Sequence, residues 1–176
     1  VEALCANLAG WLIRLAEVYQ GPAGELAAHG LRVALEKGSD AALASGLSHL
    51  SDAYRVRLFH QEALQFGALA YEASDLAPPM LRASIEIHYA SALYRLGRLE
   101  EALRHCIQAY EQTTRIIDHE NSCRALQLKG TIQQARGEIG SALEAFHRAA
   151  DLARQVGLPH VAATAELSLG VLYLDL

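Results

Sequence analysis

The sequence predicts an all-α protein, built as a solenoid of antiparallel helix hairpins with about nine helices. Ala, Leu, Glu and Arg are abundant, whereas Val and Ile are sparse and proline stands at four positions. That composition favours helices over strands. Breaks rich in glycine, proline and polar residues divide the chain into segments of about 15 to 20 residues. A pattern of small and apolar residues also recurs forty residues apart, which indicates a repeat array.

The repeat is clearest in two successive copies. The first copy is Ala90, Gly97, Leu99, Ala102, Leu103 and Ala109, and the second is Gly130, Gly137, Ile139, Ala142, Leu143 and Ala149. Half of a third copy follows at Leu169, Gly170 and Tyr173. A weaker copy lies 39 residues upstream of the first, at Ser51, Ala63, Leu64 and Ala70. The array is therefore expected to run through most of the chain as one domain.

The elements are expected in the following order. Residues 1–40 form an atypical N-terminal helical pair, with Trp11, Leu15, Val18, Leu31 and Leu35 as core. Repeats follow at 41–82, 83–122 and 123–162, and 163–176 is half a repeat. Gly97 and Gly137 can end helices in the left-handed conformation, and Asp40 and Ser122 are expected to cap helix starts. Short loops make consecutive helices antiparallel.

Small residues explain how the two helices of a hairpin approach each other. Ala90 or Gly130 on the first helix faces Ala102 or Ala142 on the second, while larger side chains such as Phe146 fill the space around them. Cys106 occupies the place of Phe146 one repeat earlier, so it is expected in the core. A large side chain at Ala142 is expected to overpack the hairpin and cost roughly 1–3 kcal/mol.

These residues resemble the tetratricopeptide repeat. The pattern of that family is a small residue in the first helix, a turn glycine, a bulky residue followed by Ala-Leu, a space-filling residue and a late Ala. Its match here is Gly130, Gly137, Ile139, Ala142, Leu143, Phe146 and Ala149. The forty-residue period, together with segment 150–157, resembles the variety in bacterial regulators such as maltose-regulator type activators and Rap-like proteins. Leu58 departs from the pattern because it replaces a turn glycine.

The resemblance implies a right-handed α-solenoid in which the first helices of the hairpins line a concave groove. The groove residues transferred from the family pattern are Ser48, His49, Asp52, Arg55, His88, Ser91, Tyr94, Arg95, Arg124, Gln127, Thr131 and Gln134. A protein or peptide segment with some acidic character suits such a surface, because Arg can bind carboxylates through two hydrogen bonds. The alternative is that these side chains form solvated helix faces.

The last segment carries a separate signal. It is apolar almost all round, and Leu167, Val171, Leu172 and Leu174 are the side chains expected to contact a partner or a second copy. Either the sequence stops in mid-repeat or this helix packs on another molecule. The start at Val1 also suggests a piece of a larger protein.

Charge and residue spacing exclude several functions. The formal charge of −5 comes without a basic block, so direct nucleic-acid binding is not expected. Charged residues interrupt every apolar stretch before a membrane span is complete. Three widely spaced cysteines predict reduced thiols in a cytoplasmic protein. No histidine pair has the spacing of a helical metal site, and no catalytic constellation is present, so neither a metal, a cofactor nor an enzymatic activity is expected.

The sequence thus predicts a non-enzymatic protein- or peptide-binding domain. We expect it to be the sensory or scaffolding part of a bacterial cytoplasmic regulatory protein, in signalling or transcription regulation. The attached effector would be a DNA-binding or GGDEF-type domain. The alternative is a structural module that forms homo-oligomers through its apolar last helix.

Overall fold

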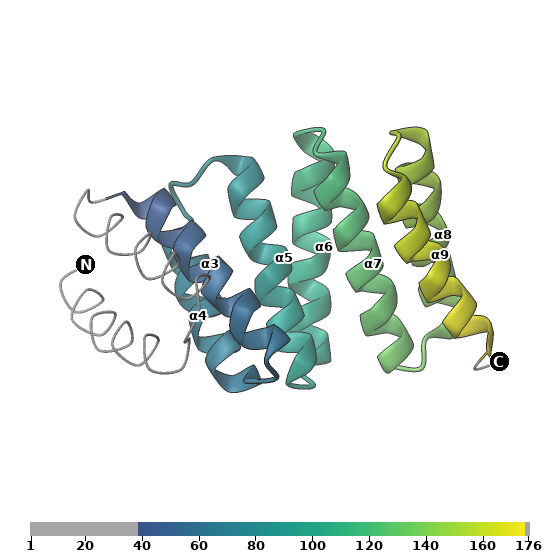
Figure 1. Ribbon diagram of the computed structural model, residues 1–176, viewed down its shortest axis with the longest axis horizontal. Coiled ribbons are helices and arrows are strands. Elements are labelled where there is room, and N and C mark those ends of the chain that lie inside the picture. The colour runs from purple at the N-terminus through teal and green to yellow at the C-terminus, as the bar shows by residue number, and fades with distance from the viewer. Residues whose placement is uncertain (1–38, 175–176) are drawn as a thin grey trace.

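A computed structural model describes residues 39–174, which form seven helices and no strand (Figure 1). The helices are α3 (Asp40–Val56), α4 (His60–Ala73), α5 (Pro79–Arg95), α6 (Leu99–Arg115), α7 (His119–Ala135), α8 (Ile139–Gln155) and α9 (Pro159–Leu174). The all-α prediction is confirmed for these residues. The predicted count of nine helices is not matched, and the expected N-terminal pair with its core residues falls in 1–38, outside the described residues.

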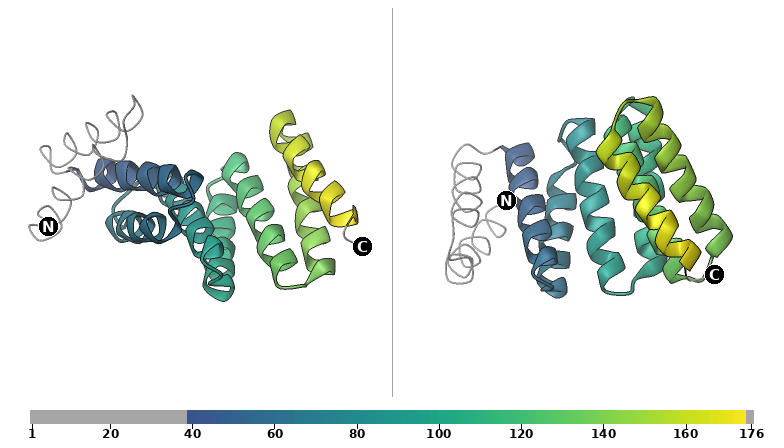
Figure 2. Two further views of the ribbon diagram at one scale, coloured as in Figure 1. Left: turned by 60° about the horizontal axis from the view of Figure 1, so that its bottom comes forward. Right: turned by 45° about the vertical axis from the view of Figure 1, so that its right-hand side comes forward.

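The helices stand side by side in a row that runs from α3 at one end to α9 at the other (Figures 1 and 2). Helices α3 with α4, α5 with α6, and α7 with α8 pack as hairpins. The first helices α3, α5, α7 and α9 also contact one another in turn, and each second helix contacts the next first helix. Within residues 39–174, helices that touch are never more than two elements apart. The described part is therefore a linear array of hairpins, as in a solenoid.

Each of five interhelical turns contains one residue in the left-handed conformation. Gly97, Gly137 and Gly157 adopt φ of +75°, +77° and +73°, which a glycine does without a steric penalty. Leu58 and Ile117 take the same role with φ of +67° and +59°. The next residue donates its amide to a carbonyl five residues back in every case, as in Arg98 N to Leu93 O at 3.0 Å. The turn therefore forms even where glycine is replaced.

The residues that cap the starts of α3 and α7 lie one and four residues before the predicted ones. Ser39, rather than Asp40, accepts the amide of Ala42, and Asp118, rather than Ser122, accepts the amide of Asn121. Ser122 lies inside α7, where its hydroxyl donates to the Asp118 carbonyl. A capping side chain must precede the first helical residue, and the loop before α7 is shorter than the sequence suggested.

The small residues of the repeat lie where helices approach most closely. Ala90, Ala102 and Ala142 are fully buried. A Cβ atom added at Gly130 would lie 2.7–2.9 Å from three ring atoms of Phe146, so α7 and α8 touch where α7 has no side chain. Cys106 is fully buried, as predicted, and its thiol donates to the Ala125 carbonyl at 2.9 Å.

Candidate functional site

A hydrogen bond across the repeat joins the first helices of two neighbouring hairpins. Ser48 in α3 and His88 in α5 are forty residues apart, and the Ser48 Oγ lies 2.8 Å from His88 Nδ1. Ser48 is buried and His88 is partly exposed. Both residues belong to the predicted groove, and the structure brings them into direct contact.

Charged groups from α3 and α7 act on the His88 imidazole. Burial lowers the pKa of His88 below its usual value of 6.5, and the positive charges of Arg124, His49 and Arg55 lower it further. The negative charge of Asp52 opposes this shift. These charged groups lie on α3 and α7, on either side of α5. We call Ser48, His49, Asp52, Arg55, His88 and Arg124 the His88 cluster.

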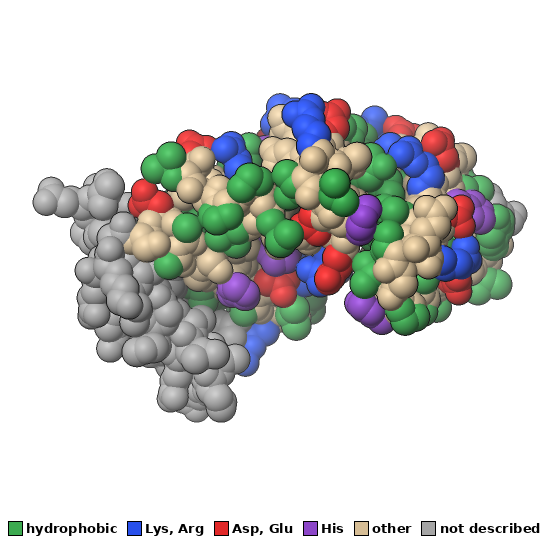
Figure 3. All heavy atoms as spheres, turned by 90° about the horizontal axis from the view of Figure 1, so that it is seen from above, with side chains coloured by type: hydrophobic (Ala, Val, Ile, Leu, Met, Phe, Trp, Pro, Cys, Tyr) green, Lys and Arg blue, Asp and Glu red, His purple; other side chains and the backbone are tan. Residues whose placement is uncertain are grey.

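The charged members of the His88 cluster also pair within their own helices. Arg55 donates to Asp52 Oδ1 through Nη2 at 2.6 Å and through Nε at 2.9 Å. Arg124 donates to Glu120 at 2.7 Å, and both of those side chains are about half exposed. In Figure 3, histidine side chains lie beside acidic and basic ones near the middle of the lower edge. The surface therefore presents both positively charged hydrogen-bond donors, the guanidinium groups, and negatively charged acceptors, the carboxylates.

The remaining predicted groove residues lie outside this cluster. Ser91, Tyr94 and Arg95 stand further along α5, where the Arg95 guanidinium lies 5.7 Å from the centroid of the Tyr94 ring. On α7, Thr131 donates to the Gln127 carbonyl, and Gln134 is half-buried. Gln127 joins α7 to α9, because its side-chain amide donates a hydrogen bond to the Val161 carbonyl at 3.0 Å.

The predicted contact residues of the last helix divide into two groups. Leu167, Val171 and Leu174 are 69%, 48% and 88% exposed. Leu172 differs from the prediction, because it is fully buried in a cluster with Ala142, Phe146 and Leu169. It faces α8 and is therefore a core residue of the array rather than a contact for a partner.

A buried polar pair escaped the sequence analysis. His105 in α6 lies with its Nδ1 atom 3.1 Å from Glu86 Oε1 in α5, and both residues are buried. The rings of Tyr71 and Tyr89 stack on each other and meet the His105 ring at 5.2 and 5.0 Å. The repeat could have indicated a buried polar residue here, since Glu86 stands at the repeat position that Leu126 occupies forty residues later.

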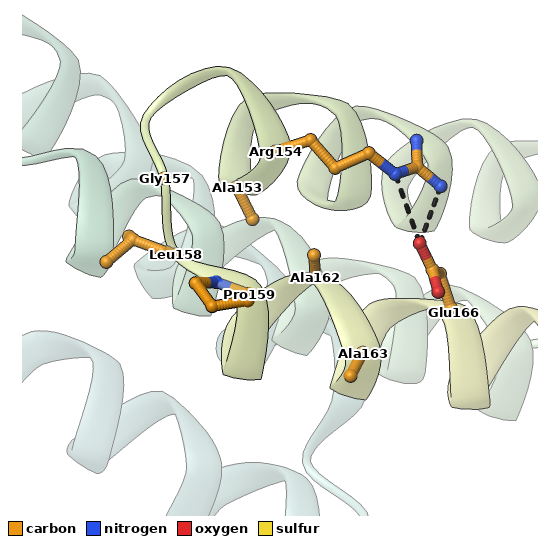
Figure 4. A pocket seen from close by; sticks show the side chains of 8 residues that line it. All are labelled: Ala153, Arg154, Gly157, Leu158, Pro159, Ala162, Ala163 and Glu166. Atoms are coloured by element: carbon orange, nitrogen blue, oxygen red, sulfur yellow. Dashed lines mark hydrogen bonds and ion pairs between the residues drawn. The ribbon is translucent and has the colours of Figure 1, made fainter.

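A hollow of about 370 Å³ lies between α8 and α9 near the turn that joins them (Figure 4). It is lined by Ala153, Arg154, Gly157, Leu158, Pro159, Ala162, Ala163 and Glu166. Arg154 donates to Glu166 Oε1 through Nη2 at 2.6 Å and through Nε at 3.1 Å. The hollow is thus mostly apolar with one ion pair at its edge.

Two other classes of site are not found in the described part of the chain. Among residues 39–174, no three His, Cys, Asp or Glu side chains are grouped so that they could hold a metal ion. No helix in that range has the length and the apolar character that crossing a membrane requires.

The hairpin geometry and the small-residue contacts agree with a comparison of the sequence with known families. Residues 81–155 match the tetratricopeptide repeat family. This match covers α6, α7, α8 and most of α5. Tetratricopeptide repeats in general form non-enzymatic scaffolds for protein interaction. The bacterial-regulator variety stays a prediction.

Comparison with solved structures supports the same fold. The chain is similar to the crystal structure of BtubC (BKLC) from P. vanneervenii, with a TM-score of 0.71 and 18% sequence identity. The similarity covers 93% of this chain and 66% of that one, so this chain spans slightly under two thirds of its length. No curated protein matches the sequence.

Proposed function

We propose that this chain is a protein-binding domain that takes a peptide or protein segment on the face formed by α3, α5 and α7. The hydrogen bond between Ser48 and His88, which joins α3 to α5 beside the charged side chains of the His88 cluster, is the observation that carries the proposal. The family match over residues 81–155 supports protein binding in general. The arginines of the cluster favour a segment that carries carboxylates, because a guanidinium can bind one through two parallel hydrogen bonds.

Exchange of partners at Arg124 gives a mechanism for such binding. Its present partner, Glu120, is half exposed, and exposed ion pairs contribute only about 0–1 kcal/mol. A ligand carboxylate can therefore replace Glu120 at little cost. The hydrogen bond between Ser48 and His88 fixes α3 against α5 beforehand. The ligand then loses conformational entropy while the receptor is already ordered.

Charge reversal at Arg124 and Arg95 tests the proposal. Arg115→Glu is the matched control, because Arg115 lies on the second helix α6, is exposed and pairs with Glu111 four residues before it. Partners captured by the wild-type chain are identified, and their affinity for each variant is measured by calorimetry. We expect Arg95→Glu/Arg124→Glu to lose binding and Arg115→Glu to retain it. Equal affinity for both variants would contradict a binding face on the first helices.

The finer role that we propose is the sensory or scaffolding part of a bacterial cytoplasmic regulator. The forty-residue period and segment 150–157 support this assignment through their resemblance to bacterial regulators. The open reading frame around these residues tests it. A DNA-binding or GGDEF-type domain in the same frame would support a regulatory role, and a frame that encodes an unrelated enzyme would oppose it.

A second candidate function is a structural module that oligomerises through α9. The exposed side chains of Leu167, Val171 and Leu174 favour an interface there. Light scattering of the wild type and of Leu167→Ser/Leu174→Ser distinguishes this candidate. Oligomers that disappear in the variant, with partner capture by the first helices unchanged, would favour it. A wild type that stays monomeric at high concentration would exclude it.

A further inference from the structure

The His88 imidazole is fixed at one ring nitrogen and open at the other. Its Nδ1 atom lies 2.8 Å from Ser48 Oγ, while Nε2 has no hydrogen bond to any residue between 39 and 174. Nε2 is not enclosed either, because the side-chain polar atoms of that range that are buried without a partner belong to His60, Arg82, Glu86 and Gln133. Nε2 therefore reaches the surface of the His88 cluster, where a ligand atom can meet it.

The contact with Ser48 allows the ring to gain a proton without any rearrangement. A serine hydroxyl both donates and accepts, so Ser48 Oγ can serve Nδ1 whether or not that nitrogen carries a proton. In an imidazolium both ring nitrogens are donors. Protonated His88 can therefore keep its bond to α3 through Nδ1 and donate outward through Nε2.

The fixed charges around His88 cancel in pairs. On α3, Arg55 lies 2.6 Å from Asp52, and on α7, Arg124 lies 2.7 Å from Glu120. Burial opposes a proton on the free ring, and so do both arginines, whereas Asp52 alone favours it. A carboxylate that binds beside His88 would thus add one negative charge that no fixed group of the cluster compensates.

Other titratable groups on and around α5 are engaged elsewhere. Glu86, two residues before His88, meets His105 of α6 at 3.1 Å. The ring of Tyr71 from α4 packs against His105 as well. His49 of α3 is exposed, so water and salt screen its charge. His88 is therefore the histidine of the cluster that responds most strongly to a nearby ligand charge, because its surroundings are less polar.

We propose that His88 takes up a proton from solvent when a carboxylate of an acidic peptide segment binds at its Nε2 atom, so that such segments bind more tightly as the pH falls. This inference rests on the proposed binding face of α3, α5 and α7. The bound carboxylate supplies the negative charge that favours the imidazolium, and the imidazolium donates to it. By linkage, uptake of one proton changes the affinity by at most about tenfold per pH unit.

The direction of the effect follows from the two protonation states. In the free chain the pKa of His88 lies below its usual value of 6.5, and a bound carboxylate raises it. Between these two values the complex holds more protons than the free chain, so binding strengthens as the pH drops through that interval. The gain ends near about pH 4.3, where a glutamate ligand itself becomes neutral.

Two matched peptides, acetyl-tetraglutamate amide and its glutamine counterpart, are the probes. NMR of the histidine rings in the full chain follows the titration of His88 with and without peptide. We expect saturating tetraglutamate to raise the pKa of His88 and tetraglutamine to leave it unchanged. The affinity for tetraglutamate should rise about three- to tenfold from pH 7.5 to 5.5.

Variants assign this pH dependence to one ring. His88→Gln keeps a side-chain N–H donor but does not titrate, so its affinity for tetraglutamate should no longer change between the two pH values. His147→Gln is the control, because His147 is an exposed histidine on the second helix α8. It should keep the pH dependence of the wild type. An equal rise in affinity for His88→Gln, or loss of the rise in His49→Gln instead, would overturn the inference.

The same titrations separate this inference from the proposed function. Binding of tetraglutamate that does not change with pH, and that Arg95→Glu/Arg124→Glu abolishes, would overturn the role of His88 and leave the binding face standing. Absence of tetraglutamate binding at both pH values would overturn the inference together with the binding of acidic segments on this face.

Discussion

At the scale of single residues, two turns carry strain that the other three avoid. Ile117 adopts φ of +59° and Leu58 adopts φ of +67°, a region that costs a residue with a Cβ atom about 1–3 kcal/mol. The cost is highest for a β-branched side chain, so Ile117 is the more strained of the two. Gly97, Gly137 and Gly157 make the same turn without it.

Ile117→Gly should therefore stabilise the chain by about 1 kcal/mol, because relief of the strain exceeds the extra entropy that glycine gives the unfolded chain. Little burial is lost, since the Ile117 side chain is 71% exposed. Urea unfolding measures the change, with Gly137→Ile as the reciprocal variant that should destabilise. A lower urea midpoint for Ile117→Gly than for the wild type would contradict backbone strain at Ile117.

The buried pair of Glu86 and His105 gives a second prediction at this scale. His105→Ala should cost about 1–3 kcal/mol, because it leaves the buried Glu86 side chain without its hydrogen-bond partner. Glu86→Leu/His105→Ala should recover most of that loss, since Leu126 and Ala145 occupy the same two positions one repeat later. Denaturant unfolding of the single and double variants measures the loss of stability and its recovery. A double variant as unstable as the single one would show that the pair itself is required.

At the scale of helices, the contact of Gly130 with Phe146 sets the distance between α7 and α8. Gly130→Ala should destabilise the chain by about 1–3 kcal/mol, because its Cβ atom would overlap the ring. Gly140→Ala is the control, and it should stabilise by up to about 1 kcal/mol as an ordinary replacement in an exposed helix. Thermal unfolding distinguishes the two. Similar melting temperatures would show that α8 shifts freely to admit the methyl group.

At the scale of the whole molecule, the lowered pKa of His88, which joins α5 to α3, makes folding stability depend on pH. Burial lowers the pKa of His88 in the folded chain, so the unfolded chain, with a pKa near 6.5, binds more protons between the two values. Folding stability should therefore fall as the pH drops below about 6.5. His88→Gln should reduce this dependence, as measured by melting temperatures from pH 7.5 to 5.5. Identical pH profiles for the two proteins would contradict a lowered pKa of His88 in the folded chain.

The sequence predicted the architecture better than it predicted the polar contacts. Gly97, Gly137 and the alanines of the repeat placed the hairpins correctly, because helix ends and close approaches depend on residues near in sequence. Glu86 and His105 were missed, because a polar residue in a core is explained only by a partner from another helix. Leu172 was misassigned because an evenly apolar helix does not reveal which side faces α8.

The restriction of contacts to near neighbours has a kinetic consequence. Since helices in residues 39–174 touch only elements one or two places away, the contacts that stabilise the array are local in sequence. Proteins rich in local contacts fold fast, and nucleation can occur at any unit of such an array. The hairpin of α7 and α8 is thus able to form before α3 and α4 are ordered. A pulling force on the two ends would correspondingly open the array one hairpin at a time.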